Sequence, residues 1–474
     1  MGAGRTRRAD ESSLPGIGTV TGVVQATVVA TDTARPVVAG RRRGLTSPLR
    51  LRLWASVVIL GAVAVLAVTE VGMSRIRAQV NVIAQQAAPQ AATASDLYFA
   101  LSDLDAQLAR LAMIGTSPTF ASDRLDALLT YQRRSAEIST DLDQATKAAT
   151  SADDRATIRA LLDQLGQYRE LAWQALAIEA DTTDQEAGKL PDGALGYYGR
   201  ATDLMHYKLL PTALRLRTSS QATLQNSYSN QRFTATLSTV LTLVLGGLLL
   251  LGLVLFQLRL LRRYRRLVNP ALLLATLATL GLVVAASVVF LDETDRLQSA
   301  QRDSFGPYLT LTQAQAVSYD AAADTSRYLI STNRAYFEQD YQAKSECLLG
   351  GGGCGASGDL LPSGLAQLSG KEVLDRWSAY QKDHDEVVNL VSGDDVDKAV
   401  QKLTGIARGD AAFDFVYYDS AAARIATAHR QAFDASMHDA RGELSGWTII
   451  PAVLMVAVIL LTLLGVRPRL AEYR

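Results

Sequence analysis

Residues 235–291 read ATLSTVLTLVLGGLLLLGLVLFQLRLLRRYRRLVNPALLLATLATLGLVVAASVVFL. Two apolar runs, 235–256 and 271–291, are joined by a short segment with five arginines and no acidic residue. Each run is long enough to cross roughly 30 Å of hydrocarbon as a helix. The stretch therefore predicts a transmembrane hairpin whose turn, at 257–270, stays in the cytoplasm with other basic loops.

Two further apolar stretches, 53–73 and 446–466, complete the pattern. Large polar segments, 74–234 and 292–445, separate the members of each pair of spans. A span, a large segment and a second span thus occur twice, head to tail, and self-similarity on this scale indicates a repeat architecture. We expect an all-α membrane protein with four transmembrane helices and two tandem extracytoplasmic domains resembling four-helix bundles, produced by internal duplication.

The large segments show helical periodicity rather than the alternation typical of strands. Details of the two halves also match, because Tyr98 and Asp103 lie 221 residues before Tyr319 and Asp324. A few such identities arise by chance in alanine-rich helices, but they agree with the spacing of the spans. We therefore predict that each large segment folds into about four helices with its own apolar core.

Charge is divided between the segments in a way that predicts the topology. Residues 1–53, 257–270 and 467–474 hold 17 basic and 4 acidic residues, whereas the two large segments hold 30 basic and 42 acidic residues. Short basic segments are retained in the cytoplasm, while long loops cross largely regardless of charge. We expect a multi-pass plasma-membrane protein with both termini cytoplasmic and with a disordered tail at 1–50.

The arginines of the hairpin are the main candidate for a cytoplasmic partner contact. They could simply signal topology, or they could bind acidic lipid or an acidic protein surface. The residues are Arg259, Arg262, Arg263, Arg265 and Arg266.

The two cysteines of the chain, Cys347 and Cys354, flank the run Leu-Leu-Gly-Gly-Gly-Gly in the second large segment. A glycine-rich connection lets the chain double back, so an extracytoplasmic disulfide is expected; unpaired thiols are the alternative. A metal site is not expected, because no histidine or third cysteine is near.

Four aromatic residues are candidates for contact with an extracytoplasmic partner: Tyr168, Trp173, Trp377 and Tyr380. They lie on the third major helix expected in each large segment, and packing in the core is the alternative role.

The sequence contains no motif that predicts catalysis. Phosphate-binding glycine loops, HExxH and GxSxG are absent. The four histidines are expected to be surface or partly buried residues rather than ligands: His206, His384, His429 and His438. We therefore expect no catalytic, cofactor or metal residues, no nucleic-acid binding and no enzymatic activity. The span centres hold no ionisable residue, which weakens a transporter interpretation.

Paired spans that flank a helical extracytoplasmic module resemble the sensor domains of bacterial chemoreceptors and histidine kinases. The hairpin and the C-terminal segment are too short for an output domain, so we expect any signal to pass through a separate protein. The four spans, the two large helical segments and the arginine-rich tail also resemble the GlnX-type membrane proteins of actinobacteria. That resemblance implies a glutamine-binding lipoprotein outside and the Ser/Thr kinase PknG inside as partners.

These observations favour a non-enzymatic signalling adaptor that relays an amino-acid or solute-binding-protein signal to a cytoplasmic effector. A structural scaffold of the cell envelope and a transporter accessory subunit are the alternatives. The ligand, the direction of the signal and homo-oligomer formation are left open by the sequence.

Overall fold

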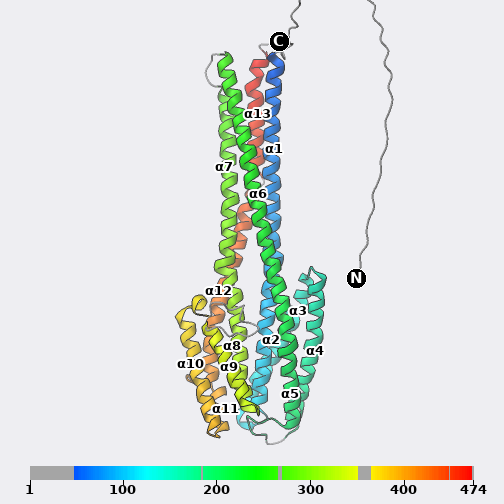
Figure 1. The fold of residues 1–474 in the computed structure, drawn as a ribbon, viewed down its shortest axis with the longest axis vertical. Coiled ribbons are helices and arrows are strands. Elements are labelled where there is room, and N and C mark those ends of the chain that lie inside the picture. The colour runs from blue at the N-terminus through cyan, green and yellow to red at the C-terminus, as the bar shows by residue number, and fades with distance from the viewer. Residues whose placement is uncertain (1–46, 183–184, 265–268, 351–364, 448, 472–474) are drawn as a thin grey trace, which may run out of the picture.

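The computed structural model describes all residues except 1–46, 183–184, 265–268, 351–364, 448 and 472–474. Within the described part of the chain all regular structure is helical, so the all-α prediction is confirmed. The molecule is a narrow rod of helices that broadens at one end into a wider helical module (Figure 1).

Three long rods run from the narrow end into the module, each without a loop. The first consists of α1 (Ser47–Val82), the π-helical segment η1 (Ile83–Ala87) and α2 (Ala88–Ile114). The second consists of α5 (Asp192–Leu204), the π-helical η3 (Met205–Leu209) and α6 (Leu210–Tyr264). The third consists of α7 (Pro270–Ser299), the π-helical η4 (Ala300–Phe305) and α8 (Gly306–Ile330). A fourth rod is formed by α12 (Ala411–Gly446) and α13 (Ile450–Ala471).

Each π-helical segment is followed two residues later by a proline: Pro89, Pro211 or Pro307. A proline inside a helix lacks an N–H and its ring clashes with the carbonyl four residues earlier. A local π-helical turn widens the backbone there and lets the helix continue. At Pro211 the result is a π-helical turn within an otherwise continuous rod.

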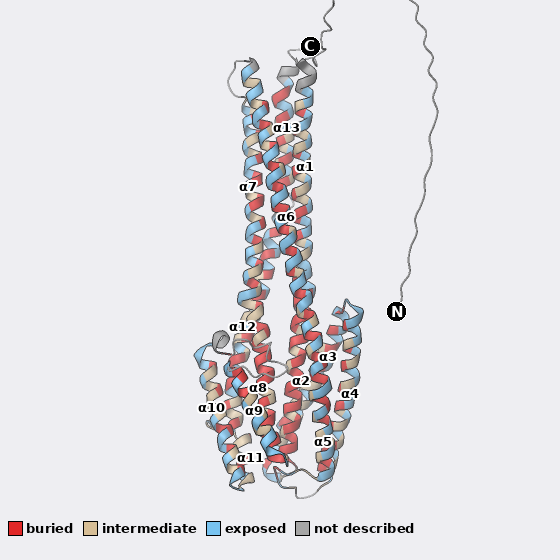
Figure 2. Cartoon of the chain, in the orientation of Figure 1, coloured by how far each residue is buried: buried red, intermediate tan, exposed pale blue. Residues whose placement is uncertain are grey.

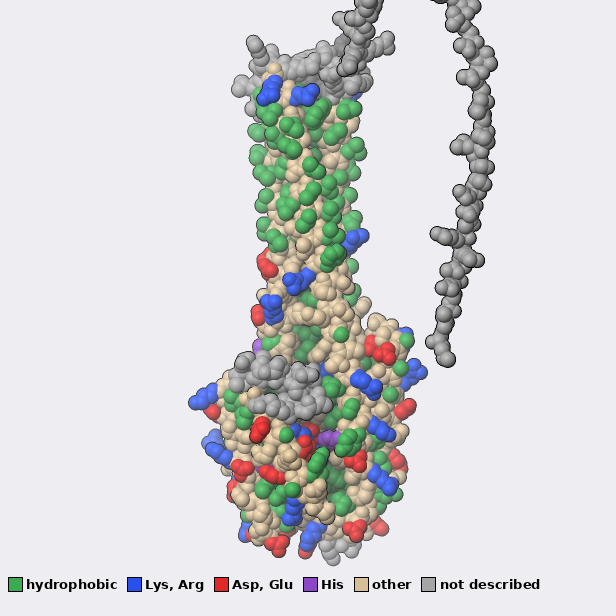
Figure 3. All heavy atoms as spheres, in the orientation of Figure 1, with side chains coloured by type: hydrophobic (Ala, Val, Ile, Leu, Met, Phe, Trp, Pro, Cys, Tyr) green, Lys and Arg blue, Asp and Glu red, His purple; other side chains and the backbone are tan. Residues whose placement is uncertain are grey.

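The narrow end has the properties of a four-helix membrane span. Four described helices are long and apolar enough to cross a membrane, with mean hydropathies of 2.2 to 2.6 in their most apolar windows. Hydrophobic side chains cover this part of the surface, and charged ones gather at its two ends (Figure 3). Inside, Val58, Leu253, Ala275 and Val458 pack together, one from each rod. Four candidate spans are therefore present.

The wider module contains two groups of helices. The first group consists of α2, the 3-10 segment η2 (Pro118–Phe120), α3 (Ala121–Ala148), α4 (Ala152–Ala180) and the start of the second rod. The second group consists of α8, α9 (Arg334–Leu349), α10 (Ala366–Ser392), α11 (Val396–Thr404) and α12.

The two groups share a core, which differs from the expectation of a separate core for each large segment. Helices α2 and α8 form the most extensive contact of the module. They are buried along most of their length (Figure 2). One hydrophobic cluster joins Leu104 and Leu108 of α2 to Ala316, Ala323 and Leu329 of α8. The apolar stripe of α2 packs against α8 of the other group because the alanines of α8 allow the two helices to approach closely.

Candidate functional site

The contact between α2 and α8 encloses a set of charged side chains, which we call the seam network. Its members are Asp105, His206, Asp320, Asp324, Arg327 and Lys344. They come from α2, η3, α8 and α9, so the network joins the two groups of helices.

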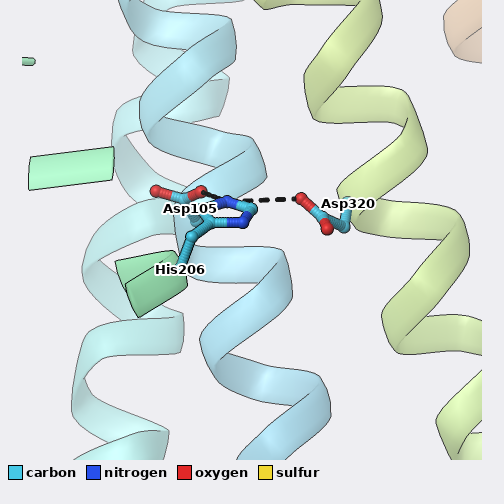
Figure 4. A group of neighbouring side chains, drawn as sticks. All are labelled: Asp105, His206 and Asp320. Carbon is cyan, nitrogen blue, oxygen red and sulfur yellow. Dashed lines mark hydrogen bonds and ion pairs between the residues drawn. The ribbon is translucent and has the colours of Figure 1, made fainter. Parts of the chain in front are cut away.

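His206 is placed between two carboxylates from opposite groups (Figure 4). Its Nε2 lies 3.2 Å from Asp105 Oδ2 and 3.5 Å from Asp320 Oδ1. The histidine belongs to the π-helical segment η3, where the extra residue per turn changes the direction in which side chains project.

Arg327 is the centre of the network and is only 1% exposed. Its Nη2 donates a hydrogen bond to Asp105 Oδ2. Its Nη1 donates to Asp320 Oδ1 at 3.1 Å and to Asp324 Oδ1 at 2.6 Å. Asp320, Asp324 and Arg327 are four and three residues apart, a spacing that places them on one face of α8.

Lys344 of α9 supplies a second positive charge to Asp320 and Asp324. Its Nζ lies 2.8 Å from Asp320 Oδ2 and also donates a hydrogen bond to Asp324. A buried carboxylate is tolerated only when it is paired and hydrogen bonded, and both aspartates meet this condition.

The surroundings set the protonation of these groups. Burial alone would lower the pKa of His206, but the charge of Asp320 and the hydrogen bond to Asp105 outweigh it and raise the pKa. Burial would raise the pKa of Asp320, but Lys344, His206 and Arg327 hold it well below its ordinary value. Burial dominates at Asp324 and raises its pKa to about 6. The network thus favours a protonated His206 beside an ionised Asp320.

Asp105, His206 and Asp320 together offer three ligand atoms within 4.8 Å of one another, a grouping that could hold a metal ion. The same Asp105 and Asp320 oxygens, however, already accept hydrogen bonds from the buried Arg327. A cation placed there would face an adjacent guanidinium charge, so the donor set fits an ion network better than a metal centre.

Three of the four aromatic residues predicted to contact an outside partner are buried. Trp377 and Tyr380 lie in the core of the second group, with their ring centroids 5.2 Å apart. Tyr168 is buried in the first group and donates a hydrogen bond to Asp105 Oδ1 at 3.1 Å. The partner-contact prediction is therefore wrong for these three, because their apolar rings complete the cores. Only Trp173, which is 66% exposed, remains accessible.

The hairpin arginines are only partly described. Helix α6 continues to Tyr264, so Arg259 and Arg262 lie on a helical extension of the span. The Arg259 guanidinium lies 5.7 Å from the ring centroid of Trp54 in α1. Arg265, Arg266 and the side chain of Arg263 fall outside the described residues.

Asn269 fixes the start of α7 to the fourth rod. Its side chain accepts a hydrogen bond from Ala271 N, and its Nδ2 donates to Gly465 O at 2.9 Å. This bond joins the third rod to the fourth, while the contact between Arg259 and Trp54 joins the second rod to the first.

Cys347 is buried in the last turn of α9. Cys354 lies outside the described residues, so the disulfide stays a prediction.

The seam network is not predicted by the sequence analysis, which expects His206 to be a surface or partly buried residue. One signal was available. Helices α2 and α8 each carry a strong apolar stripe, and charged residues occur among the apolar ones. These charged residues are Asp103, Asp105, Asp320, Asp324 and Arg327. Charged residues inside such stripes are rarely buried unless they are paired.

One segment of the chain, residues 79–229, resembles a known protein family. These residues match the actinobacterial sensor domain family. The matched region includes the whole first group of helices, from the end of α1 to the middle of α6, and therefore contains Asp105 and His206. Neither the curated proteins nor the solved structures provide a match. The sensor-domain match and the four apolar helices indicate a sensor-type membrane protein.

Proposed function

We propose that this protein is a non-enzymatic transmembrane sensor whose wider module lies outside the cell and whose hairpin contacts a separate cytoplasmic effector. The observation that carries the proposal is the continuity of the rods. The first and third rods run from the apolar span into α2 and α8, the two helices that meet at the seam network. A shift between α2 and α8 would therefore move the spans directly.

The internal duplication predicted from the sequence is consistent with this arrangement. The first and third rods both carry a π-helical segment and a proline just before the module, at η1 and η4. Two similar rods that meet through a polar seam form an element in which small helix displacements produce alternative packings.

The cytoplasmic end offers a surface for the effector. Arg262 is exposed at the end of α6, while Arg259 is held against Trp54. Guanidinium groups suit carboxylate- or phosphate-bearing partners, a Ser/Thr kinase among them. Both termini are assigned to the cytoplasm on the charge distribution. An extracytoplasmic solute-binding protein could supply the signal.

The relay is tested with spin labels at positions 262 and 467, on α6 and α13, in a background without native cysteines. Arg327→Met, which breaks the seam network, should change the distance distribution between the labels in nanodiscs. Arg430→Gln provides the control, because Arg430 also links the two groups, through Asp96 at 3.1 Å, but is 47% exposed. An unchanged distribution in Arg327→Met, with hydrogen exchange showing that α2 has loosened, would contradict the relay and favour a scaffold.

The effector contact is tested by replacing Arg262, Arg263 and Arg266 with Gln while Arg259 and Arg265 keep the topology signal. Insertion should be unaffected and cytosolic partners should no longer co-purify. Recovery of the same partners from the variant would show that the hairpin arginines only orient the protein in the membrane and do not bind the effector.

A further inference from the structure

A cavity of about 130 Å³ lies beside the seam network, on the side of the second group. Its walls come from α2, α8, α10, α11 and α12, so it lies between the two groups of helices. An engineered protein cavity of about 150 Å³ is known to hold benzene, so this cavity has room for a ligand with about one aromatic ring.

Aromatic rings form one wall of the cavity. The ring of Phe415 packs edge-on against Tyr319, with centroids 4.9 Å apart, and against Tyr380, with centroids 5.2 Å apart. Both tyrosine hydroxyls are engaged elsewhere, Tyr319 with Asp419 and Tyr380 with Thr325. The rings are thus held rigidly and offer apolar surface to an occupant.

Polar groups are found on the α2 side of the same cavity. The Oε1 of Gln107 is buried and accepts no hydrogen bond, although its Nε2 donates to Asp103. As an acceptor it could pair with an O–H or N–H of an occupant but not with a carboxylate, so recognition of an anion falls to Arg110. Arg110 reaches Asp126 at 3.4 Å and Asp123 only at 4.0 Å. Its side chain is 25% exposed. These long ion pairs leave guanidinium donors available for a stronger acceptor.

We propose that this cavity binds a small aromatic carboxylic acid, with the ring against Phe415 and the carboxylate at Arg110. A buried apolar wall with a few polar groups at one side is the usual composition of a small-molecule site. A planar carboxylate matches the donor geometry of a guanidinium. The assignment rests on the proposed sensor function, because an occupant of this cavity would contact both α2 and α8, the helices that the relay uses.

Binding is tested with the full chain in lipid nanodiscs, using benzoate as the probe and benzamide as its uncharged counterpart. Saturable binding of benzoate is expected with a dissociation constant of about 1 mM or tighter, as is reasonable for a ligand of this size. Benzamide should bind at least about 10-fold more weakly, because a charge-assisted hydrogen bond is lost.

Two variants locate the site. Arg110→Gln should remove the preference for benzoate, while Arg133→Gln, a change at an exposed arginine of the neighbouring α3, should retain it. Ala322→Leu, which fills the cavity from α8, should prevent binding of both probes. Ala322→Leu could lose binding because it destabilises the fold, which a lower unfolding temperature would reveal. In that case the comparison of Arg110→Gln with Arg133→Gln still tests whether the carboxylate binds at Arg110. Equal affinity for the two probes, an equal effect of both arginine variants, or the absence of saturable binding would overturn the assignment.

The spin-label distance between positions 262 and 467 separates this inference from the proposed function. Benzoate binding that leaves the distance unchanged would support the cavity and contradict the relay. A distance change in Arg327→Met without any benzoate binding would support the relay and contradict the cavity.

Discussion

Removal of the Arg327 side chain is the most informative single perturbation of this fold. Arg327→Met retains much of the buried aliphatic volume but leaves Asp105 and Asp324 without their guanidinium partner. Both carboxylates are almost fully buried. Breaking a buried ion pair by removing one partner costs about 3–5 kcal/mol. Lys344 still reaches Asp324, and His206 and Tyr168 still reach Asp105, so the loss should lie at the lower end of this range, near 3 kcal/mol.

A double-mutant cycle isolates the contact across the seam. Asp105→Asn is combined with Arg327→Met, and the free energies of unfolding come from urea titrations in mild detergent. Because the residues share a hydrogen bond, the losses should be non-additive by about 0.5–3 kcal/mol. The pair of Asp96 and Arg430, which is more exposed than the seam network, is the matched control, since it also joins the two groups but should contribute at most about 1 kcal/mol. Additive losses at Asp105 and Arg327, or a larger effect at Arg430, would refute the reasoning.

Three further predictions concern pH, topology and the cysteines. The pKa of His206 is raised by folding, so its stabilising contribution is fully present below about pH 6.5 and is lost as the pH rises through its folded pKa. Urea titrations should show a larger loss of unfolding free energy with rising pH in the wild-type protein than in His206→Gln. Reporter fusions at Gln185 should be external and those at Asn269 internal; an external Asn269 would reverse the topology. Cys347 and Cys354 should resist thiol labelling until they are reduced. Replacement of either cysteine with serine should lower the free energy of unfolding by about 1–3 kcal/mol, because the disulfide closes only a short loop.

The helical class and the four candidate spans could be predicted from the sequence because both depend on local composition. Hydrophobic runs such as 235–256 and 271–291 are self-contained signals. The continuation of the spans into the module could be predicted in the same way. Hydropathy changes where a span ends, but nothing in 74–82 or 292–299 stops a helix, so the helices continue into the module.

The shared core and the seam network depend on pairing between distant segments. The apolar stripe at Leu97–Leu111 predicts a buried helix face, but it does not say which helix will cover it. Asp105 and Arg327 are 222 residues apart and become neighbours only when α2 packs on α8. The burial of Tyr168 follows from the same long-range packing, since its hydroxyl finds its acceptor on α2.

The position of the π-helical segments indicates how movement at the seam network could reach the membrane. A continuous α-helix transmits tilt or rotation along its axis, whereas a proline and a π-helical turn make bending less costly at one point. The first and third rods have these features at η1 and η4, between the apolar span and the seam network. Each rod can therefore change direction there without breaking its helix. Since α2 and α8 are nearly enclosed by other helices, their relative displacement must be small. We therefore expect a shift of about 1–2 Å at the hairpin rather than a domain rotation.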